Sequence, residues 1–184
     1  LYFEFSHLYI TEPKVNQPLQ SNSQVLVLNG EIYNFQELAA RLNIDSTKFN
    51  DVSVFFQHIE HFGLLDTLMR TNGMYSGFLF NKITGQCDVF TDHVGKKPLL
   101  VWNSRIGWHV GTGIDFNYVD EKTTKIKVVP PGISAFDIKT GNTFKEYSHL
   151  PIKINELNLI DTLEDAVSLR IPKNMPFAVA LSGG

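Results

Sequence analysis

The sequence has almost no cysteine and no long apolar segment. Its 184 residues include one cysteine, Cys87, so neither an internal disulfide nor a cysteine-based zinc site can form. No apolar run approaches the roughly 20 residues of a membrane-spanning helix, and the chain begins without a recognisable signal peptide. The formal net charge is −3, without the basic excess typical of nucleic-acid-binding domains. These absences favour a cytoplasmic protein that binds neither nucleic acid nor a membrane.

What remains is an ordinary globular composition, with 43% hydrophobic and 19% charged residues. A chain of this length builds one good core, and a second domain would be small or incomplete. The chain begins at Leu1 without methionine and ends within a motif at Gly184. We therefore expect it to be a fragment of a longer protein.

Strand-forming patterns dominate the first 147 residues. Alternating or continuous apolar runs predict strands over residues 3–10, 24–28, 76–80, 86–90, 99–102, 108–111, 133–137 and 143–147. Short turn signals between them predict antiparallel hairpins. Helical spacing predicts helices over residues 35–42, 51–62 and 64–70.

The pattern changes after residue 147. Residues 148–154 contain Pro151 and are typical of a linker, and residues 155–170 have the spacing of an amphipathic helix. Residues 177–181 are continuously apolar and predict a short buried strand, which leads into Ser182-Gly183-Gly184. The backbone N–H groups of such a loop suit a pyrophosphate, although three residues at a chain end could equally be a flexible tail.

The most informative segment is residues 25–35. The apolar run of residues 25–28 predicts a buried strand, and Asn29-Gly30 predicts a tight turn at its end because both residue types tolerate positive φ. An amide, a bare backbone N–H and the Glu31 carboxylate at a strand end could bind a small polar ligand. The other interpretation is an ordinary hairpin turn with a surface glutamate.

The run Asn29-Gly30-Glu31-Ile32-Tyr33-Asn34 resembles the signature of class II glutamine amidotransferase domains, above all those of asparagine synthetases. The resemblance implies hydrolysis of glutamine by an N-terminal cysteine whose α-amino group acts as the base. It implies an oxyanion hole made by Asn29 and Gly30, and a glutamine pocket that includes Glu31. The cysteine expected at the chain start is not among these residues.

Two further positions belong to the implied glutamine pocket. Asp51 follows Asn50 at the start of the helix over residues 51–62, where the family binds the α-ammonium of glutamine. Helix capping explains the same pair of residues, and the two roles are compatible. His7 stands where the family has an arginine that clamps the α-carboxylate, and histidine cannot form that bidentate pair. A strand histidine without a role is the other interpretation of His7.

Other matches to the family are interpreted as structural. Residues 91–99 resemble a family hairpin in which Asp92 caps a turn, and Pro130-Pro131-Gly132 precedes the last strand pair. Gln17-Pro18 also matches the family, which supports the alignment. Cys87 lies in an alternating strand and is interpreted as a packing residue.

The strand and helix patterns predict an α+β fold over residues 1–147, with two sheets and helices outside them. The resemblance implies that this fold is a four-layer αββα sandwich of the N-terminal-nucleophile hydrolase type. Residues 155–184 are expected to begin an α/β ligase domain, because Ser182, Gly183 and Gly184 resemble the pyrophosphate loop of ATP-pyrophosphatase ligases. The resemblance implies no metal or cofactor in the amidotransferase region, but ATP and Mg²⁺ in the parent enzyme.

The implied parent reaction is amidation of aspartate with ammonia from glutamine. The substrates would be glutamine, aspartate and ATP. A homodimer is a candidate assembly, but the sequence itself does not show the oligomeric state. The alternative is a non-catalytic scaffold domain of a related amide- or lactam-forming ligase. In either case this chain alone is predicted not to hydrolyse glutamine, because it lacks the nucleophile.

Overall fold

The fold is known from a computed structural model that describes residues 2–3, 13–123, 126–147, 158–171, 176–181 and 183. The chain divides into two compact units, residues 1–152 and 153–184. Within its described residues the first unit holds two sheets and helices α1 to α3, and the second holds helix α4 (Leu159–Arg170). None of the helices in the described ranges is long and apolar enough to cross a membrane.

The larger sheet has six strands in the order β1-β2-β3-β4-β8-β9, with every neighbouring pair antiparallel. The strands are β1 (Leu19–Gln20), β2 (Gln24–Ile32), β3 (Gly73–Asn81), β4 (Cys87–Thr91), β8 (Gly132–Phe136) and β9 (Thr143–Tyr147). Polar side chains set the β3–β4 and β8–β9 hairpin turns. Asn81 Oδ1 accepts the N–H of Ile83, and Asp137 Oδ1 accepts the N–H of Lys139.

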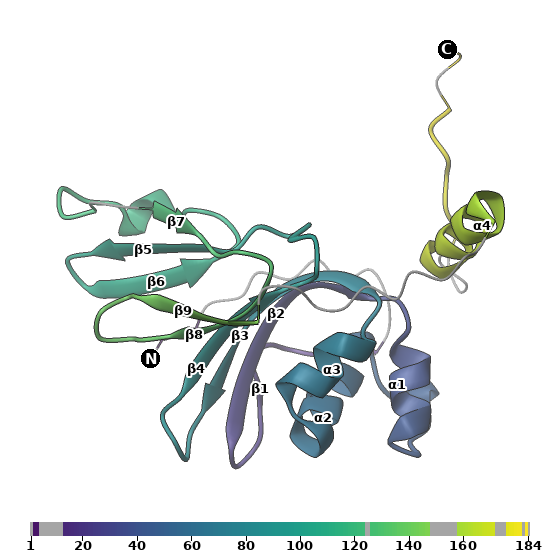
Figure 1. Ribbon diagram of the computed structural model, residues 1–184, viewed down its shortest axis with the longest axis horizontal. Helices are drawn as coiled ribbons and strands as arrows, with labels where there is room; N and C mark the ends of the chain where they lie inside the picture. The colour runs from purple at the N-terminus through teal and green to yellow at the C-terminus, as the bar shows by residue number, and fades with distance from the viewer. Residues whose placement is uncertain are drawn as a thin grey trace. The chain divides into compact units, whose positions relative to one another are not determined.

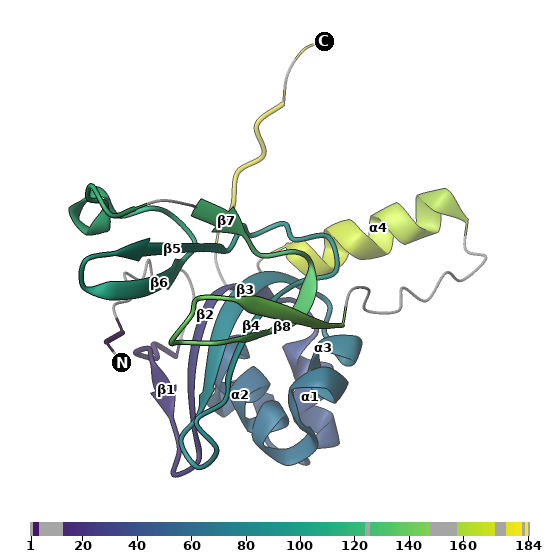
Figure 2. The same cartoon turned by 60° about the vertical axis from the view of Figure 1, so that its left-hand side comes forward.

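The smaller sheet lies against one face of the larger one (Figures 1 and 2). Its strands, in the order β6-β5-β7, are β5 (Leu100–Ser104), β6 (Gly107–Gly111) and β7 (Ile126–Val128). A buried apolar cluster joins the sheets through Cys87, Val89, Leu99, Val101, Val129 and Phe136.

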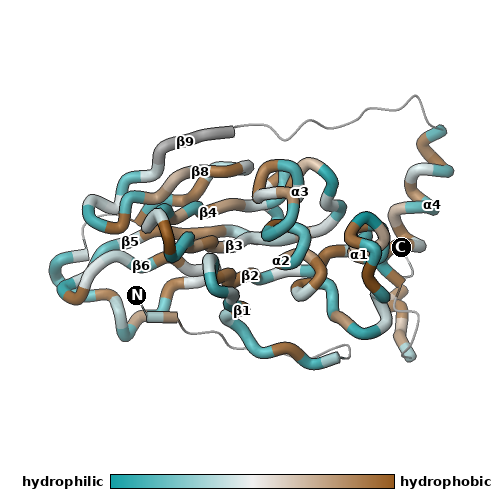
Figure 3. Tube along the Cα trace, turned by 90° about the horizontal axis from the view of Figure 1, so that it is seen from below, coloured by the Kyte–Doolittle hydropathy of each residue, from teal (hydrophilic) through white to brown (hydrophobic). Residues whose placement is uncertain are grey.

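The helices cover the opposite face of the larger sheet, as Figure 3 shows from below. They are α1 (Phe35–Arg41), α2 (Asp51–Phe62) and α3 (Leu64–Arg70), and the short 3₁₀ helices η1 (Ser46–Lys48) and η2 (Phe116–Tyr118) lie in loops. The main core is formed where Phe55 and Ile59 of α2 pack with Leu26, Leu28 and Ile32 of β2. Gly63, with φ 83°, ends α2.

Most predicted elements are confirmed. Each strand predicted between residues 24 and 147 is present, and the helix over 51–62 has its predicted limits. The described residues of the first unit form three layers (helices, larger sheet, smaller sheet), so the α+β class with antiparallel sheets is established. The predicted strand over residues 3–10 lies almost wholly outside the described residues, as does the linker over 148–154.

Two local predictions are wrong. Asn29-Gly30 does not form a tight turn, because β2 continues through both residues to Ile32 and stays paired with β3. Residues 177–181 do not form a buried strand, and Phe177, Val179 and Leu181 are exposed. A buried strand needs partners that take up its backbone hydrogen bonds, and no described residue pairs with this segment.

Candidate functional site

The predicted oxyanion residues lie in the second half of β2. In the register with β3, Asn29 lies opposite Ser76, Gly30 opposite Tyr75 and Glu31 opposite Met74. The Asn29 side chain points toward the smaller sheet, because its Nδ2 donates a 3.0 Å hydrogen bond to Thr112 Oγ1 in the loop after β6. By the alternation of strand side chains, Glu31 lies on the same face, where it is exposed.

Gly30 allows β2 and β3 to approach closely. Its φ is 146°, a value that residues with a Cβ rarely adopt. A Cβ at this position would also overlap the carbonyl oxygen of Met74 and the Cα of Tyr75. The glycine that suggested a turn is therefore required inside the strand, for contact with its neighbour.

The outer edge of β2 presents three alternate backbone N–H groups. That of Leu28 donates to Gln17 Oε1 at 2.7 Å, and that of Ile32 donates to Asp51 Oδ2 at 2.9 Å. Because N–H groups two residues apart in a strand point the same way, the N–H of Gly30 points to this edge between the two bonds. The site thus offers a backbone donor beside the Asn29 amide.

Asp51 is the first residue of α2 and is held beside the end of β2. Asn50 caps the helix by accepting the N–H of Ser53 at 2.9 Å, as the capping interpretation predicted. Burial raises the pKa of the Asp51 carboxyl, and the nearby Glu31 charge raises it further, against the backbone N–H bonds of Ile32 and Val52. A cation bound beside these two carboxylates would relieve their repulsion, so the arrangement suits an ammonium group.

Asn34 is a structural residue of the signature to which the sequence assigned no role. It is buried, donates from Nδ2 to the carbonyl of Arg70 at 2.9 Å, and accepts the N–H of Asn72 at 2.8 Å. These bonds join the loop after β2 to the segment that enters β3. Its place at the end of the signature is the only signal that could have drawn attention to it.

The hairpin after β4 is structural, as predicted. The buried Asp92 carboxylate accepts the N–H of Tyr75 at 3.0 Å through Oδ2 and the N–H of Val94 at 3.0 Å through Oδ1. Cys87 is buried in the core between the sheets, and burial raises its pKa to about 11. A thiol in that environment is protonated at neutral pH and fits the predicted packing role.

The described structure does not place the remaining predicted site residues relative to this edge. His7, Ser182 and Gly184 lie outside the described residues. Gly183 is described and exposed, and no atom of the described residues comes within 4 Å of the position of a Cβ there. Among the described residues, no group of three or more His, Cys, Asp or Glu side chains could hold a metal ion.

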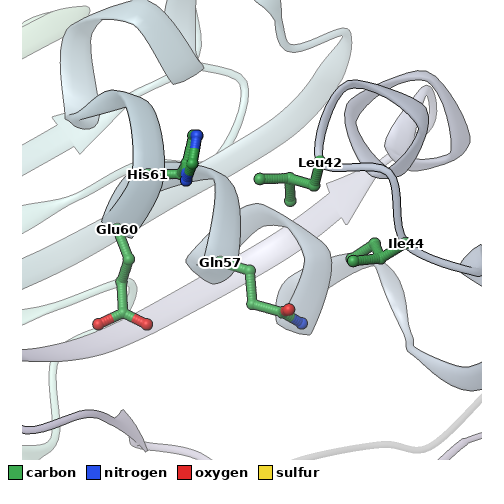
Figure 4. Close-up of a pocket in the computed structure, with 5 residues that line it drawn as sticks. All are labelled: Leu42, Ile44, Gln57, Glu60 and His61. Carbon is green, nitrogen blue, oxygen red and sulfur yellow. The ribbon is translucent and has the colours of Figure 1, made fainter.

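Two cavities lie away from the predicted site. One, of about 310 Å³, is lined by Leu42 and Ile44 after α1 and by Gln57, Glu60 and His61 of α2 (Figure 4). The other, of about 600 Å³, lies beside the hairpin ends at residues 85–87 and 135–139. The predicted glutamine site is therefore an open strand edge in the described residues and coincides with neither cavity.

Comparison with known proteins agrees with the signature. A family model described as a glutamine amidotransferase domain matches residues 6–127. An asparagine synthetase (glutamine-hydrolyzing) of Brassica oleracea is 29% identical over 205 residues, covering 100% of this chain and 33% of that protein. Asparagine synthetase (glutamine-hydrolyzing) 1 of Bacillus subtilis is 27% identical over 206 residues, covering 91% of this chain and 32% of the relative. The chain thus spans about a third of the length of the curated relatives it matches.

Solved structures support the fold. The glutamine phosphoribosylpyrophosphate amidotransferase of Bacillus subtilis, solved with ADP and GMP, matches with a TM-score of 0.57 and 22% sequence identity. The match covers 76% of this chain and 32% of that one. At this identity the likeness concerns the fold alone.

Proposed function

Because this chain belongs to the glutamine amidotransferase domain family, we propose that it forms the glutamine-binding and oxyanion-stabilising part of a glutaminase site. The observation that carries the proposal is the edge of β2. There the Asn29 amide and the Gly30 N–H belong to neighbouring residues of the strand. The Asp51 carboxylate of α2 is hydrogen-bonded to the Ile32 N–H, two residues farther along the same strand.

The proposed chemistry is acyl transfer from the side-chain amide of glutamine. A thiolate attacks the amide carbon, and the negative charge that develops on the oxygen is stabilised by Asn29 Nδ2–H and Gly30 N–H. The amide nitrogen takes up a proton as the C–N bond breaks and leaves as ammonia, and water then hydrolyses the thioester to glutamate and regenerates the thiol. The nucleophile in this proposal is an N-terminal cysteine encoded before Leu1, as the family resemblance implies.

Substrate recognition is assigned to the charged groups around this edge. Asp51 and Glu31 would bind the α-ammonium, which is supported by the effect of the Glu31 charge on the Asp51 pKa. His7 would face the α-carboxylate in place of the family arginine. A single histidine contact predicts weaker binding of glutamine than a bidentate arginine gives.

The wider proposal concerns the longer protein. Its similarity to asparagine synthetases supports an ATP-dependent amidation of aspartate that uses Mg²⁺ and takes place in the cytoplasm. The same similarity supports a second helical layer on the smaller sheet and a ligase domain that begins at residue 155. It also supports a homodimer. The resemblance assigns the nucleotide phosphates to Ser182, Gly183 and Gly184. The described surroundings of Gly183 form no cradle, so no step of the reaction is assigned to ATP or Mg²⁺ in this chain.

The test is glutamine hydrolysis by the full-length protein that contains this region. Asn29→Ala should lower kcat by roughly 100- to 1,000-fold with a small change in KM, because it removes a donor to the oxyanion. Asn117→Ala changes an exposed asparagine of η2 and serves as the matched control, with wild-type kinetics expected. Equal kcat values for Asn29→Ala and wild type would contradict the assignment.

The scaffold alternative is tested by the encoded residues before Leu1. A Met-Cys-Gly-Ile start supports the glutaminase, and any other residue at the cysteine position supports the scaffold. The 184-residue chain alone should release no glutamate from glutamine, and measurable turnover by it would refute the need for an outside nucleophile.

A further inference from the structure

We propose that Gln17 and Thr112 are positioning residues that hold the two oxyanion donors, Gly30 N–H and Asn29 Nδ2–H, in place. The proposal rests on the glutaminase function proposed above. Neither residue belongs to the signature, and they come from segments 95 positions apart in the sequence, one before β2 and one after β6. Both are hydrogen-bonded to adjacent residues of β2: Gln17 to Leu28, and Thr112 to Asn29.

Gln17 takes the place of a strand residue along the edge of β2. β1 pairs with β2 through Leu19 opposite Leu26 and Gln20 opposite Val25, so continuing this register puts residue 17 opposite Leu28. There the bonds are made by the Gln17 side chain, with Nε2 donating to the Leu28 carbonyl at 2.8 Å and Oε1 accepting the Leu28 N–H at 2.7 Å. The side-chain amide thus acts as one more paired peptide group.

This pairing fixes the backbone next to Gly30. The peptide that joins Leu28 to Asn29 is held by Gln17, and the N–H of Ile32 is held by Asp51 on the same edge. Gly30 lies between these two points and has the greatest conformational freedom of any residue type. Holding both sides limits the directions in which its N–H can point, which pre-organises the donor.

Thr112 fixes the other donor. An asparagine amide nitrogen carries two hydrogens, so one can be donated to Thr112 Oγ1 while the second is donated to an oxyanion. Without the threonine oxygen, the Asn29 amide would be free to rotate about its last torsion, which is broad for this residue type. The bond also joins β2 to the loop after β6 in the smaller sheet.

The decisive experiment is a double-mutant cycle in the full-length protein. Thr112→Val removes the oxygen with little change in shape, and should lower kcat about 10-fold while KM changes less than about twofold, since orientation and not substrate binding is lost. Thr112→Ser restores the oxygen and should recover wild-type kcat. In an Asn29→Ala background, Thr112→Val should have no further effect, because Thr112 acts through Asn29.

The matched control is Thr84→Val. Thr84 is an exposed threonine of the β3–β4 turn whose Oγ1 also accepts a single hydrogen bond, from the Gln86 N–H at 3.2 Å. It should leave kcat and KM unchanged. A further 10-fold loss from Thr112→Val in the Asn29→Ala background, or full activity of Thr112→Val alone, would overturn the role of Thr112.

Gln17 is tested by Gln17→Glu, which keeps the acceptor for the Leu28 N–H and places a second oxygen against the Leu28 carbonyl. We expect a loss of at least about 10-fold in kcat with KM nearly unchanged. Wild-type kcat in this variant would overturn the role of Gln17. An inactive wild-type protein would overturn the proposed function and the positioning roles together, whereas an active wild type with unaffected variants contradicts only the positioning roles.

Discussion

Asp51 combines a structural role and a proposed binding role in one carboxylate. Its folded-state pKa lies above the ordinary 3.8, so the folded chain holds a proton there more tightly than the unfolded chain does. By linkage, folding stability falls as pH rises through the interval between 3.8 and the raised pKa. Asp51→Asn keeps an oxygen for the Ile32 N–H and removes this charge. We therefore expect an equal or higher Tm at pH 7.

The same substitution should weaken the proposed binding of glutamine. Loss of the buried charge should weaken glutamine binding to the full-length protein by at least about 30-fold, measured by isothermal titration calorimetry. Asp161→Asn, which changes an exposed first-turn acid of α4, should affect neither Tm nor binding. Unchanged glutamine affinity of Asp51→Asn would show that Asp51 only tethers the start of α2 to β2.

Tyr75 carries a buried hydroxyl that the core does not satisfy. Its side chain lies among Phe55 and Phe90, at ring-centroid distances of 5.7 and 6.3 Å, and its Oη has no hydrogen-bond partner within the described part of the chain. Tyr75→Phe keeps the ring and removes the desolvated oxygen. We expect it to raise the free energy of unfolding by about 1 kcal/mol in urea denaturation of the chain. A decrease would mean that the hydroxyl is bonded in solution.

At the scale of helices, one hydrogen-bonded chain joins α1, α2 and α3. Arg41 Nη1 lies 3.2 Å from His58 Nε2, His58 Nδ1 lies 2.9 Å from Thr67 Oγ1, and Thr67 Oγ1 donates to the Gly63 carbonyl. Arg41 can only donate, so Nε2 is the acceptor and Nδ1 carries the proton. The buried His58 is therefore neutral. Burial lowers its pKa, as does the Arg41 charge, while Asp66 acts in the opposite direction.

This arrangement predicts a loss of stability in mild acid. The His58 contribution to stability is complete above its ordinary pKa of 6.5 and is lost as pH falls from there toward the lowered folded-state pKa. His58→Asn keeps a donor for Thr67 and cannot titrate. In urea denaturation at pH 7.5 and 5.5, the variant should be less stable than wild type at pH 7.5, and the difference should shrink at pH 5.5. An equal difference at both pH values would contradict the assignment of a neutral, acid-sensitive His58.

The sequence predicted elements well where local chemistry determines them. The hairpin turns at Asn81 and Asp137 and the capped start of α2 at Asn50 depend on neighbouring residues and were expected. Gly30 was misassigned to a turn. A glycine is needed there because the Met74 backbone, 44 residues away in the sequence, packs too closely for a Cβ, and no local sequence pattern indicates such a contact. For the same reason, no local pattern indicates that the Gln17 side chain pairs with Leu28.

At the scale of the whole first unit, the candidate site depends on both sheets. The family resemblance predicted site roles for Asn29, Gly30, Glu31 and Asp51 from local motifs. It could not place Thr112 beside Asn29, because that contact exists only where the loop after β6 meets the end of β2. The proposed site thus requires the smaller sheet to pack on the larger one. This packing can be tested by substitutions that lie outside the site.

Two equivalent hairpin turns provide that test. Gly85 in the β3–β4 turn and Gly141 in the β8–β9 turn both have positive φ, 74° and 65°, and both donate their N–H to the residue four positions earlier. A Cβ at Gly85 would meet nothing within 4 Å, whereas a Cβ at Gly141 would overlap the ring of Trp108 in the smaller sheet. Alanine at either position introduces similar backbone strain, roughly 1 kcal/mol. Gly141→Ala should therefore lower the free energy of unfolding by about 1–3 kcal/mol more than Gly85→Ala, because it also disturbs the contact between the sheets. Urea denaturation of the two variants measures this difference, and equal losses would show that Trp108 does not pack on the β8–β9 turn.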